Sequence, residues 1–247
     1  MHNDAIPAAT LVVWRDHDSG PEILIVERSA TMAFAAGAIV FPGGRIDEAD
    51  CQLATVLGRQ GDAAKVSAIR ETIEETGVLA AVKGSADPAL GLKLQALLHS
   101  GAELQPLLDS HDLQPDLDML TPFARWMPAF KQPRKFDTIF YMAAALPGDW
   151  RPNPQEGECV AAEWASPAAL LERIDRGEAS AIFPTKRNLE RLAQHLSLSA
   201  ALDDARNHSL ETIIPWVEEI GGEPHVRIPE GRGYPVISEP LATAFRA

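Results

Sequence analysis

The stretch FPGGRIDEADCQLATVLGRQGDAAKVSAIRETIEETGV, residues 41–78, decides the fold. It opens with Gly43 and Gly44, which favour a tight turn because glycine tolerates positive φ and close backbone approach. From Ala63 onward, alanine, lysine, arginine and glutamate predict a helix. Gly77 suits the left-handed residue that commonly ends a helix. The core-facing stripe of this helix consists of Val66, Ile69 and Ile73.

The opposite face of this helix carries Glu71, Glu74 and Glu75. Their i, i+3, i+4 spacing places all three carboxylates on one side. They repel one another, and the C-terminal end of a helix dipole disfavours anions. A solvated acidic face is the ordinary interpretation of such a cluster. A divalent cation is the alternative, because hard cations prefer carboxylate oxygens.

The wider pattern resembles the Nudix box, Gly-x5-Glu-x7-Arg-Glu-U-x-Glu-Glu-x-Gly-U, where U is apolar. Residues 70–78 match its second half, with Thr72 at the first U position. The resemblance implies an α/β fold, namely a Nudix-type α/β/α sandwich with a mixed sheet. Extra helices are expected after the box and at the C-terminus.

The first half of the box is split. Counted from Gly44, the arginine is due at 44 + 14 = 58 but is Arg70, so 12 residues are extra. Asp50 stands where the first glutamate is due, with Asp47 and Glu48 nearby. Residues 51–62 are expected to form a loop or frayed extension, because they contain two glycines.

A split box resembles one Nudix subgroup, the hydrolases related to the mammalian peroxisomal coenzyme A diphosphatase. Three further segments resemble that subgroup, so the similarity extends over most of the chain. They are residues 23–44, 122–141 and 158–170, the last followed by 184–196.

The chemistry of the residues and the resemblance together suggest a metal site. Glu71, Glu74 and Glu75 are the expected ligands of Mg²⁺ or Mn²⁺. The resemblance adds the carbonyl of Gly43 and a glutamate from outside the box, for which we choose Glu158. Glu156 and a plain surface carboxylate remain alternatives to Glu158.

The expected catalytic residues are Glu71, Glu74 and Arg70. The general base is Glu71, Glu74 or an outer carboxylate, since a carboxylate serves as ligand or base equally well. Arg70 is expected to orient a glutamate through a charge-assisted pair. In the family that partner is the first glutamate of the box, and here Asp50 either replaces it or the pair is displaced.

Basic residues are candidate phosphate contacts in this acidic chain. Arg134 and Lys135 lie in a basic loop with Lys131, and a solvated turn is the alternative interpretation of that loop. Arg28, Arg45 and Arg125 are further candidates for substrate binding.

The length of 247 residues predicts one domain over 1–247, and the resemblance implies that it is a Nudix domain. The net charge of −13 argues against binding a nucleic-acid polymer. We expect a helical insertion at about 84–118, packed as core rather than as a lid, and a helical or extended addition from about 184. Two cysteines form no disulfide framework, and no apolar run reaches membrane length. These features favour a cytoplasmic protein without a membrane partner.

The periodicity of apolar residues predicts the other elements. The expected strands are residues 9–15, 22–28, 38–41, 78–82, 120–127, 136–146 and 158–165. The expected helices are two within 88–109, broken near Ser100, and then 167–177, 184–196 and 199–207. Residues 213–220 are either helical or extended. The turn-rich segment 230–235 either folds back over the site or helps to hold a homodimer.

The leading functional hypothesis is metal-dependent hydrolysis of a diphosphate linkage in a small nucleoside diphosphate derivative. Coenzyme A or an acyl derivative is favoured by the subgroup resemblance alone. An NADH or ADP-ribose pyrophosphatase is the runner-up. A catalytically silent module that binds a nucleotide is the alternative from another class.

Overall fold

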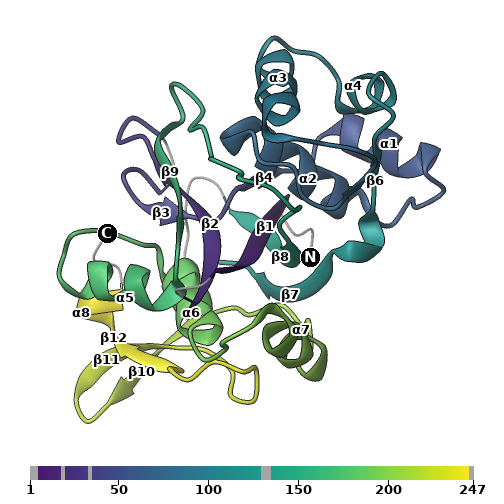
Figure 1. The fold of residues 1–247 in the computed structure, drawn as a ribbon. Coiled ribbons are helices and arrows are strands. Elements are labelled where there is room, and N and C mark those ends of the chain that lie inside the picture. The colour runs from purple at the N-terminus through teal and green to yellow at the C-terminus, as the bar shows by residue number, and fades with distance from the viewer. Residues whose placement is uncertain (1–4, 18–19, 33–34, 129–134, 245–247) are drawn as a thin grey trace.

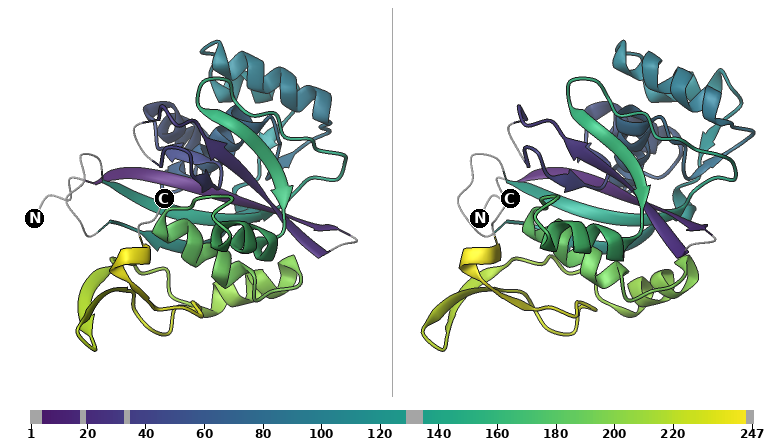
Figure 2. Two further views of the ribbon diagram at one scale, coloured as in Figure 1. Left: turned by 90° about the vertical axis from the view of Figure 1, so that its left-hand side faces the viewer. Right: turned by 60° about the vertical axis from the view of Figure 1, so that its left-hand side comes forward.

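A computed structural model describes residues 5–17, 20–32, 35–128 and 135–244. A mixed sheet lies between two helical layers, as the resemblance predicts (Figures 1 and 2). Its strands are β1 (Ile6–His17), β2 (Gly20–Arg28), β3 (Ile39–Val40), β4 (Gly43–Arg45), β7 (Thr121–Trp126), β8 (Phe136–Ala144) and β9 (Cys159–Ala165). The main order is β3-β2-β1-β8-β7, with β4 paired to β1 and β9 paired to β2.

The central strand β1 is buried on both faces. It pairs in parallel with β8 and antiparallel with β2 and β4. Leu11 and Val13 join the core cluster on one side of the sheet, whereas Val12 and Trp14 join the cluster on the other. Alternate side chains of a strand point to opposite faces, so a continuous apolar run needs a cover on each.

One face is covered by helices from the first half of the chain. They are α1 (Glu48–Val56), α2 (Ala63–Thr76), α3 (Pro88–His99) and α4 (Leu104–Asp109). The break near Ser100 between α3 and α4 is confirmed. Leu94, Leu98, Leu104 and Leu108 are buried in the core cluster on this side, as expected for leucine stripes that pack.

Two local expectations are wrong. Residues 51–56 are helical, and only 57–62 form a connection, because Leu53 and Ala54 are buried in the core around α2. The strand expected at 78–82 is limited to its last residue, which begins β5 (Val82–Lys83) and pairs with β6 (Gln114–Pro115). Ala81 adopts a φ of 53°, which interrupts an extended conformation.

The other face is covered by the second half of the chain. The short helix η1 (Leu117–Met119) precedes β7. After β9 come α5 (Pro167–Asp175), α6 (Phe183–Leu192), α7 (Leu198–Asn207), β10 (Trp216–Ile220), β11 (Glu223–Arg227), β12 (Ser238–Pro240) and α8 (Leu241–Ala244). Of the two conformations expected for residues 213–220, the structure shows the extended one from Trp216 onward, as strand β10. Among the described helices, none has the length and apolar character needed to traverse a bilayer.

Helix α3 approaches the C-terminal end of α2 closely. A Cβ atom at Gly91 would overlap the carbonyl oxygen of Gly77 and lie 2.8 Å from the Trp150 ring. Beside this contact, the Gln95 amide donates to the Glu74 carbonyl oxygen at 3.0 Å. The absence of a side chain at Gly91 therefore allows α3 to pack closely against the last turn of α2.

We expect Gly91→Ala to lower the free energy of unfolding by about 1–3 kcal/mol, because overpacking outweighs the better helix propensity of alanine. Urea unfolding followed by circular dichroism measures the change. Gly61→Ala is the matched control, since a Cβ there meets no atom within 4 Å. Equal stability of the two variants would contradict the close-approach explanation.

Candidate active site

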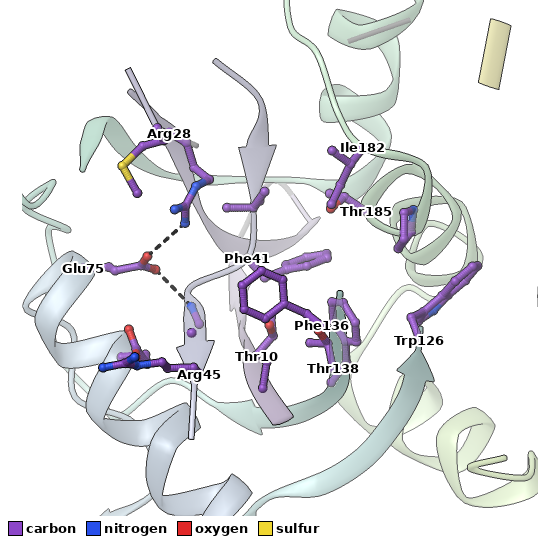
Figure 3. A pocket seen from close by; sticks show the side chains of 18 of the residues that line it. Thr10, Arg28, Phe41, Arg45, Glu75, Trp126, Phe136, Thr138, Ile182 and Thr185 are labelled. Atoms are coloured by element: carbon purple, nitrogen blue, oxygen red, sulfur yellow. Dashed lines mark hydrogen bonds and ion pairs between the residues drawn. The ribbon is translucent and has the colours of Figure 1, made fainter. Parts of the chain in front are cut away.

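A cavity of about 520 Å³ opens between the acidic face of α2 and the segment that leads into α6. One end is polar, lined by α2 and the glycines of β4. The other end is apolar, lined by side chains of β7 and β8 and by residues 181–185 (Figure 3). The cavity therefore joins the predicted acidic cluster to an aromatic chamber.

Arg70 is the centre of the acidic end. Its Nε and Nη2 atoms donate to the two carboxylate oxygens of Asp50, each at 2.9 Å. Its Nη1 atom lies 2.9 Å from Glu71 Oε1 and 2.9 Å from Glu74 Oε2. Burial lowers the pKa of Arg70, but the bond to Asp50 and the charges of Glu71 and Glu74 outweigh it and raise the pKa overall. The guanidinium is thus a permanent cation that holds three carboxylates.

Asp50 joins α1 to α2 across the split of the box. It is 1% exposed and lies in the first turn of α1, where its Oδ2 atom also accepts from the Asp47 backbone N–H at 2.8 Å. The carboxylate therefore caps α1 and pairs with Arg70 at once. The carboxylate that pairs with Arg70 is therefore Asp50.

Glu75 is held by two other groups. Its Oε2 atom accepts from the Gly43 backbone N–H at 3.0 Å, and its Oε1 atom lies 3.6 Å from Arg28 Nη1 (Figure 3). Burial, followed by repulsion from Glu71, raises the pKa of Glu75 to about 8 despite Arg28 and Gly43. The pKa of Glu75 is therefore raised mainly because a buried carboxylate is costly to charge.

Glu71 packs beneath the glycine turn. A Cβ atom at Gly44 would overlap its carboxylate, so any other residue there would displace the Glu71 carboxylate. Burial raises the pKa of Glu71 to about 7, opposed by Arg70 and reinforced by Glu74. Burial raises the pKa of Glu74 as well, again opposed by Arg70.

The carboxylates fit a divalent cation by their chemistry. Glu71, Glu74, Glu75 and Glu158 all line the cavity, together with Gly43. Carboxylate and carbonyl oxygens are the donors that Mg²⁺ and Mn²⁺ prefer. In the described part of the chain, however, no three acidic, histidine or cysteine groups converge as a ready metal site. Glu71 and Glu74 lie against Arg70, whereas Glu75 lies against Gly43 and Arg28.

The other predicted residues divide between the cavity and its surroundings. Arg28 and Arg45 line it, and so does Glu158, which directly precedes β9. Its competitor Glu156 is not among the described residues of the lining.

Two of the predicted phosphate contacts lie elsewhere. Arg125 donates to both carboxylate oxygens of Asp137, at 2.8 and 2.7 Å. Neither Arg125 nor Lys135 is among the described residues that line the cavity. Arg134 and Lys131 lie outside the described residues.

Sequence reasoning missed the apolar end of the cavity. Its large side chains come from four separate parts of the chain. They are Phe41, Trp126, Met127, Phe136, Phe140, Ile182 and Phe183. In sequence each is an ordinary apolar residue of a strand or helix start, and only the fold brings them together.

The α/β/α sandwich and the glutamates of α2 beside a glycine turn define a Nudix fold. No protein-family model matches the chain. The chain is 32% identical to a solved Nudix hydrolase from Alicyclobacillus acidocaldarius, with a TM-score of 0.71 over 82% of this chain and 97% of that one. The chain belongs to the Nudix hydrolase family and is a Nudix pyrophosphohydrolase.

Two curated relatives are more distant. The acyl-coenzyme A diphosphatase NUDT19 of Gallus gallus is 26% identical over 79% of this chain and 67% of that protein. A putative nudix hydrolase 7 of Caenorhabditis elegans is 26% identical over 70% of this chain. The match spans 56% of the nematode protein. The name of the chicken relative agrees with the subgroup that the split box resembles.

We expect Asp50→Ala to destabilise the fold by about 3–5 kcal/mol, because it leaves the buried guanidinium of Arg70 without its main partner. Denaturant unfolding at pH 7 measures the loss. Glu48→Ala, at an exposed position of the same first turn, is the control and should change stability by less than about 1 kcal/mol. A loss below that level for Asp50→Ala would show that the pair does not support the fold.

The acid cluster also predicts a pH dependence of stability. The Glu75 pKa rises on folding from an ordinary 4.5 to about 8, so the folded state binds more protons between these values. Stability contributed by the protonated group is full below about pH 4.5 and falls as the pH rises toward 8, by up to about 1.4 kcal/mol per pH unit. In EDTA, Glu75→Gln should therefore flatten the pH profile of the unfolding free energy. Parallel pH profiles of the unfolding free energy for the wild type and Glu75→Gln would contradict the raised pKa of Glu75.

Proposed function

We propose that this protein hydrolyses the diphosphate linkage of a nucleoside diphosphate derivative with the help of Mg²⁺ or Mn²⁺. Coenzyme A or an acyl-coenzyme A is the favoured substrate. The observation that carries the proposal is the two-ended cavity, with carboxylates at one end and aromatic side chains at the other. Such a cavity suits a substrate in which a diphosphate joins two chemically different groups.

The cation is proposed to bind Glu71, Glu74 and Glu75, with Glu158 and the Gly43 carbonyl as further ligands. When bound, such a cation neutralises phosphate charge and makes water a better nucleophile. Within the chain, Arg70 orients Glu71 and Glu74, and Asp50 orients Arg70 in turn. Arg28 and Arg45 line the same cavity and are the proposed phosphate contacts.

Glu71 is the proposed general base. Its carboxylate lines the polar end of the cavity beside Gly44, the part of the site where a general base must reach the attacking water. Glu74 and Glu158 are the alternatives, since both line the cavity.

The choice of coenzyme A rests on the split box and on the name of the chicken relative, an acyl-coenzyme A diphosphatase. The apolar end supports an acyl group or a base next to the diphosphate. NADH and ADP-ribose are the second candidates, because aromatic side chains also suit a stacked base.

We expect the purified protein to hydrolyse at least one of coenzyme A, octanoyl-coenzyme A, NADH, ADP-ribose and diadenosine polyphosphates with Mg²⁺ or Mn²⁺, and to lose activity in EDTA. Glu74→Gln should lower kcat by about 100-fold or more, because one carboxylate of the site becomes neutral. Assays that quantify the two phosphorylated products at a fixed metal concentration measure both effects.

Glu172→Gln, an exposed glutamate on α5, is the control and should keep full activity. Full activity of Glu74→Gln would show that the assigned site is wrong. Failure of every substrate with both metals would favour the silent nucleotide-binding module.

A further inference from the structure

The turn-rich segment 230–235 packs onto α6. Gly233 has a φ of 81°, and a Cβ atom there would lie 2.7 Å from Nε of the buried Arg191. The Gln194 amide donates to the Gly233 carbonyl oxygen at 3.0 Å. This seat brings the next residue, Tyr234, into the core on this side of the sheet.

Tyr234 closes a hydrogen-bonded triangle with Trp126 and Asn188. Its hydroxyl donates to Asn188 Oδ1 at 2.8 Å and accepts from Trp126 Nε1 at 3.1 Å. Trp126 Nε1 also donates to Asn188 Oδ1, at 3.2 Å. Tyr234 is 7% exposed, Trp126 is 3% exposed and Asn188 is 0% exposed, so water does not compete for these bonds.

Trp126 is also part of the cavity wall. It lines the apolar end, where Figure 3 shows it beside Phe136 and Thr138, and its ring packs edge-to-face against Phe183 at 6.2 Å. It also packs edge-to-face against the Tyr234 ring at 5.5 Å. The indole thus contacts two rings and is hydrogen-bonded at its only polar atom.

We propose that Tyr234 and Asn188 are positioning residues that hold Trp126 as a wall of the substrate cavity, so that the C-terminal addition helps to select the substrate. The group selected is an apolar one attached to the diphosphate. This inference rests on the proposed function, because it assigns the occupant of the end remote from the glutamates.

Two parts of a substrate share that chemistry, an acyl chain and a nucleobase. The lining carries rings and aliphatic side chains, and the indole N–H that it contains is already bonded inward to Asn188 and Tyr234. Comparing the binding of octanoyl-coenzyme A, coenzyme A and ADP-ribose distinguishes the acyl chain from the nucleobase. Tighter binding of octanoyl-coenzyme A than of coenzyme A indicates the acyl chain, and equal binding indicates the base.

The test compares Tyr234→Phe with Tyr141→Phe. Tyr141 is the chain's other tyrosine, is 6% exposed, and makes no hydroxyl hydrogen bond to the described residues. Affinity is measured in Mg²⁺ as KM and kcat for each probe that is hydrolysed, and by calorimetry for each that is not. Methylenediphosphonate serves as a probe that has the diphosphate charge but no remote group.

We expect Tyr234→Phe to weaken binding of octanoyl-coenzyme A or ADP-ribose by about 3- to 10-fold, with kcat within about 2-fold, as for the loss of one buried hydrogen bond. Methylenediphosphonate binding should stay within about 2-fold, and Tyr141→Phe should change neither. The effect should vanish in a Trp126→Phe background, because Tyr234 acts through the indole N–H.

Five results decide the inference. Unchanged affinities for Tyr234→Phe overturn it, and so does an equal loss for methylenediphosphonate, which would indicate a general structural role. Additive effects of Tyr234→Phe and Trp126→Phe overturn the route through Trp126. Binding that follows the expected pattern without any hydrolysis supports the inference and rejects the proposed activity, whereas no binding of any probe rejects both.

Discussion

The buried ion pair between Arg70 and Asp50 is the interaction on which the acidic end of the molecule depends. It joins α1 to α2 and satisfies two guanidinium N–H groups below the surface. The remaining donors of Arg70 reach Glu71 and Glu74, so one cation organises three carboxylates that otherwise repel. The Asp50 carboxylate reaches this arginine from the first turn of α1.

The site is built where the two halves of the fold meet. The first half supplies α2 and the glycine turn, which carry charge, whereas the second half supplies aromatic side chains from β7, β8 and the start of α6. The sheet holds both, because β1 lies between them and is covered on each face. The C-terminal tail extends this arrangement by anchoring Trp126 through Tyr234 and Asn188.

Sequence reasoning succeeded where a local pattern has a local cause. The helical spacing of Glu71, Glu74 and Glu75, the ending at Gly77 and the leucine stripes of α3 and α4 are all consequences of backbone periodicity. It failed at α1, where Gly58 and Gly61, which follow the helix in sequence, suggested a loop. There the burial of Leu53 and Ala54 against α2 decides the conformation, and no short-range rule reports that contact.

The sequence by itself determined the family pattern, the acidic face of one helix and most strands and helices, because these depend on neighbours within a few residues. Only the tertiary structure decided that Asp50 is the partner of Arg70, that Arg125 binds Asp137 instead of lining the cavity, and that Tyr234 reaches Trp126. These contacts join residues 12 to 108 positions apart. Which side chains meet at such separations depends on how the sheet and its two helical layers pack, which no local pattern encodes.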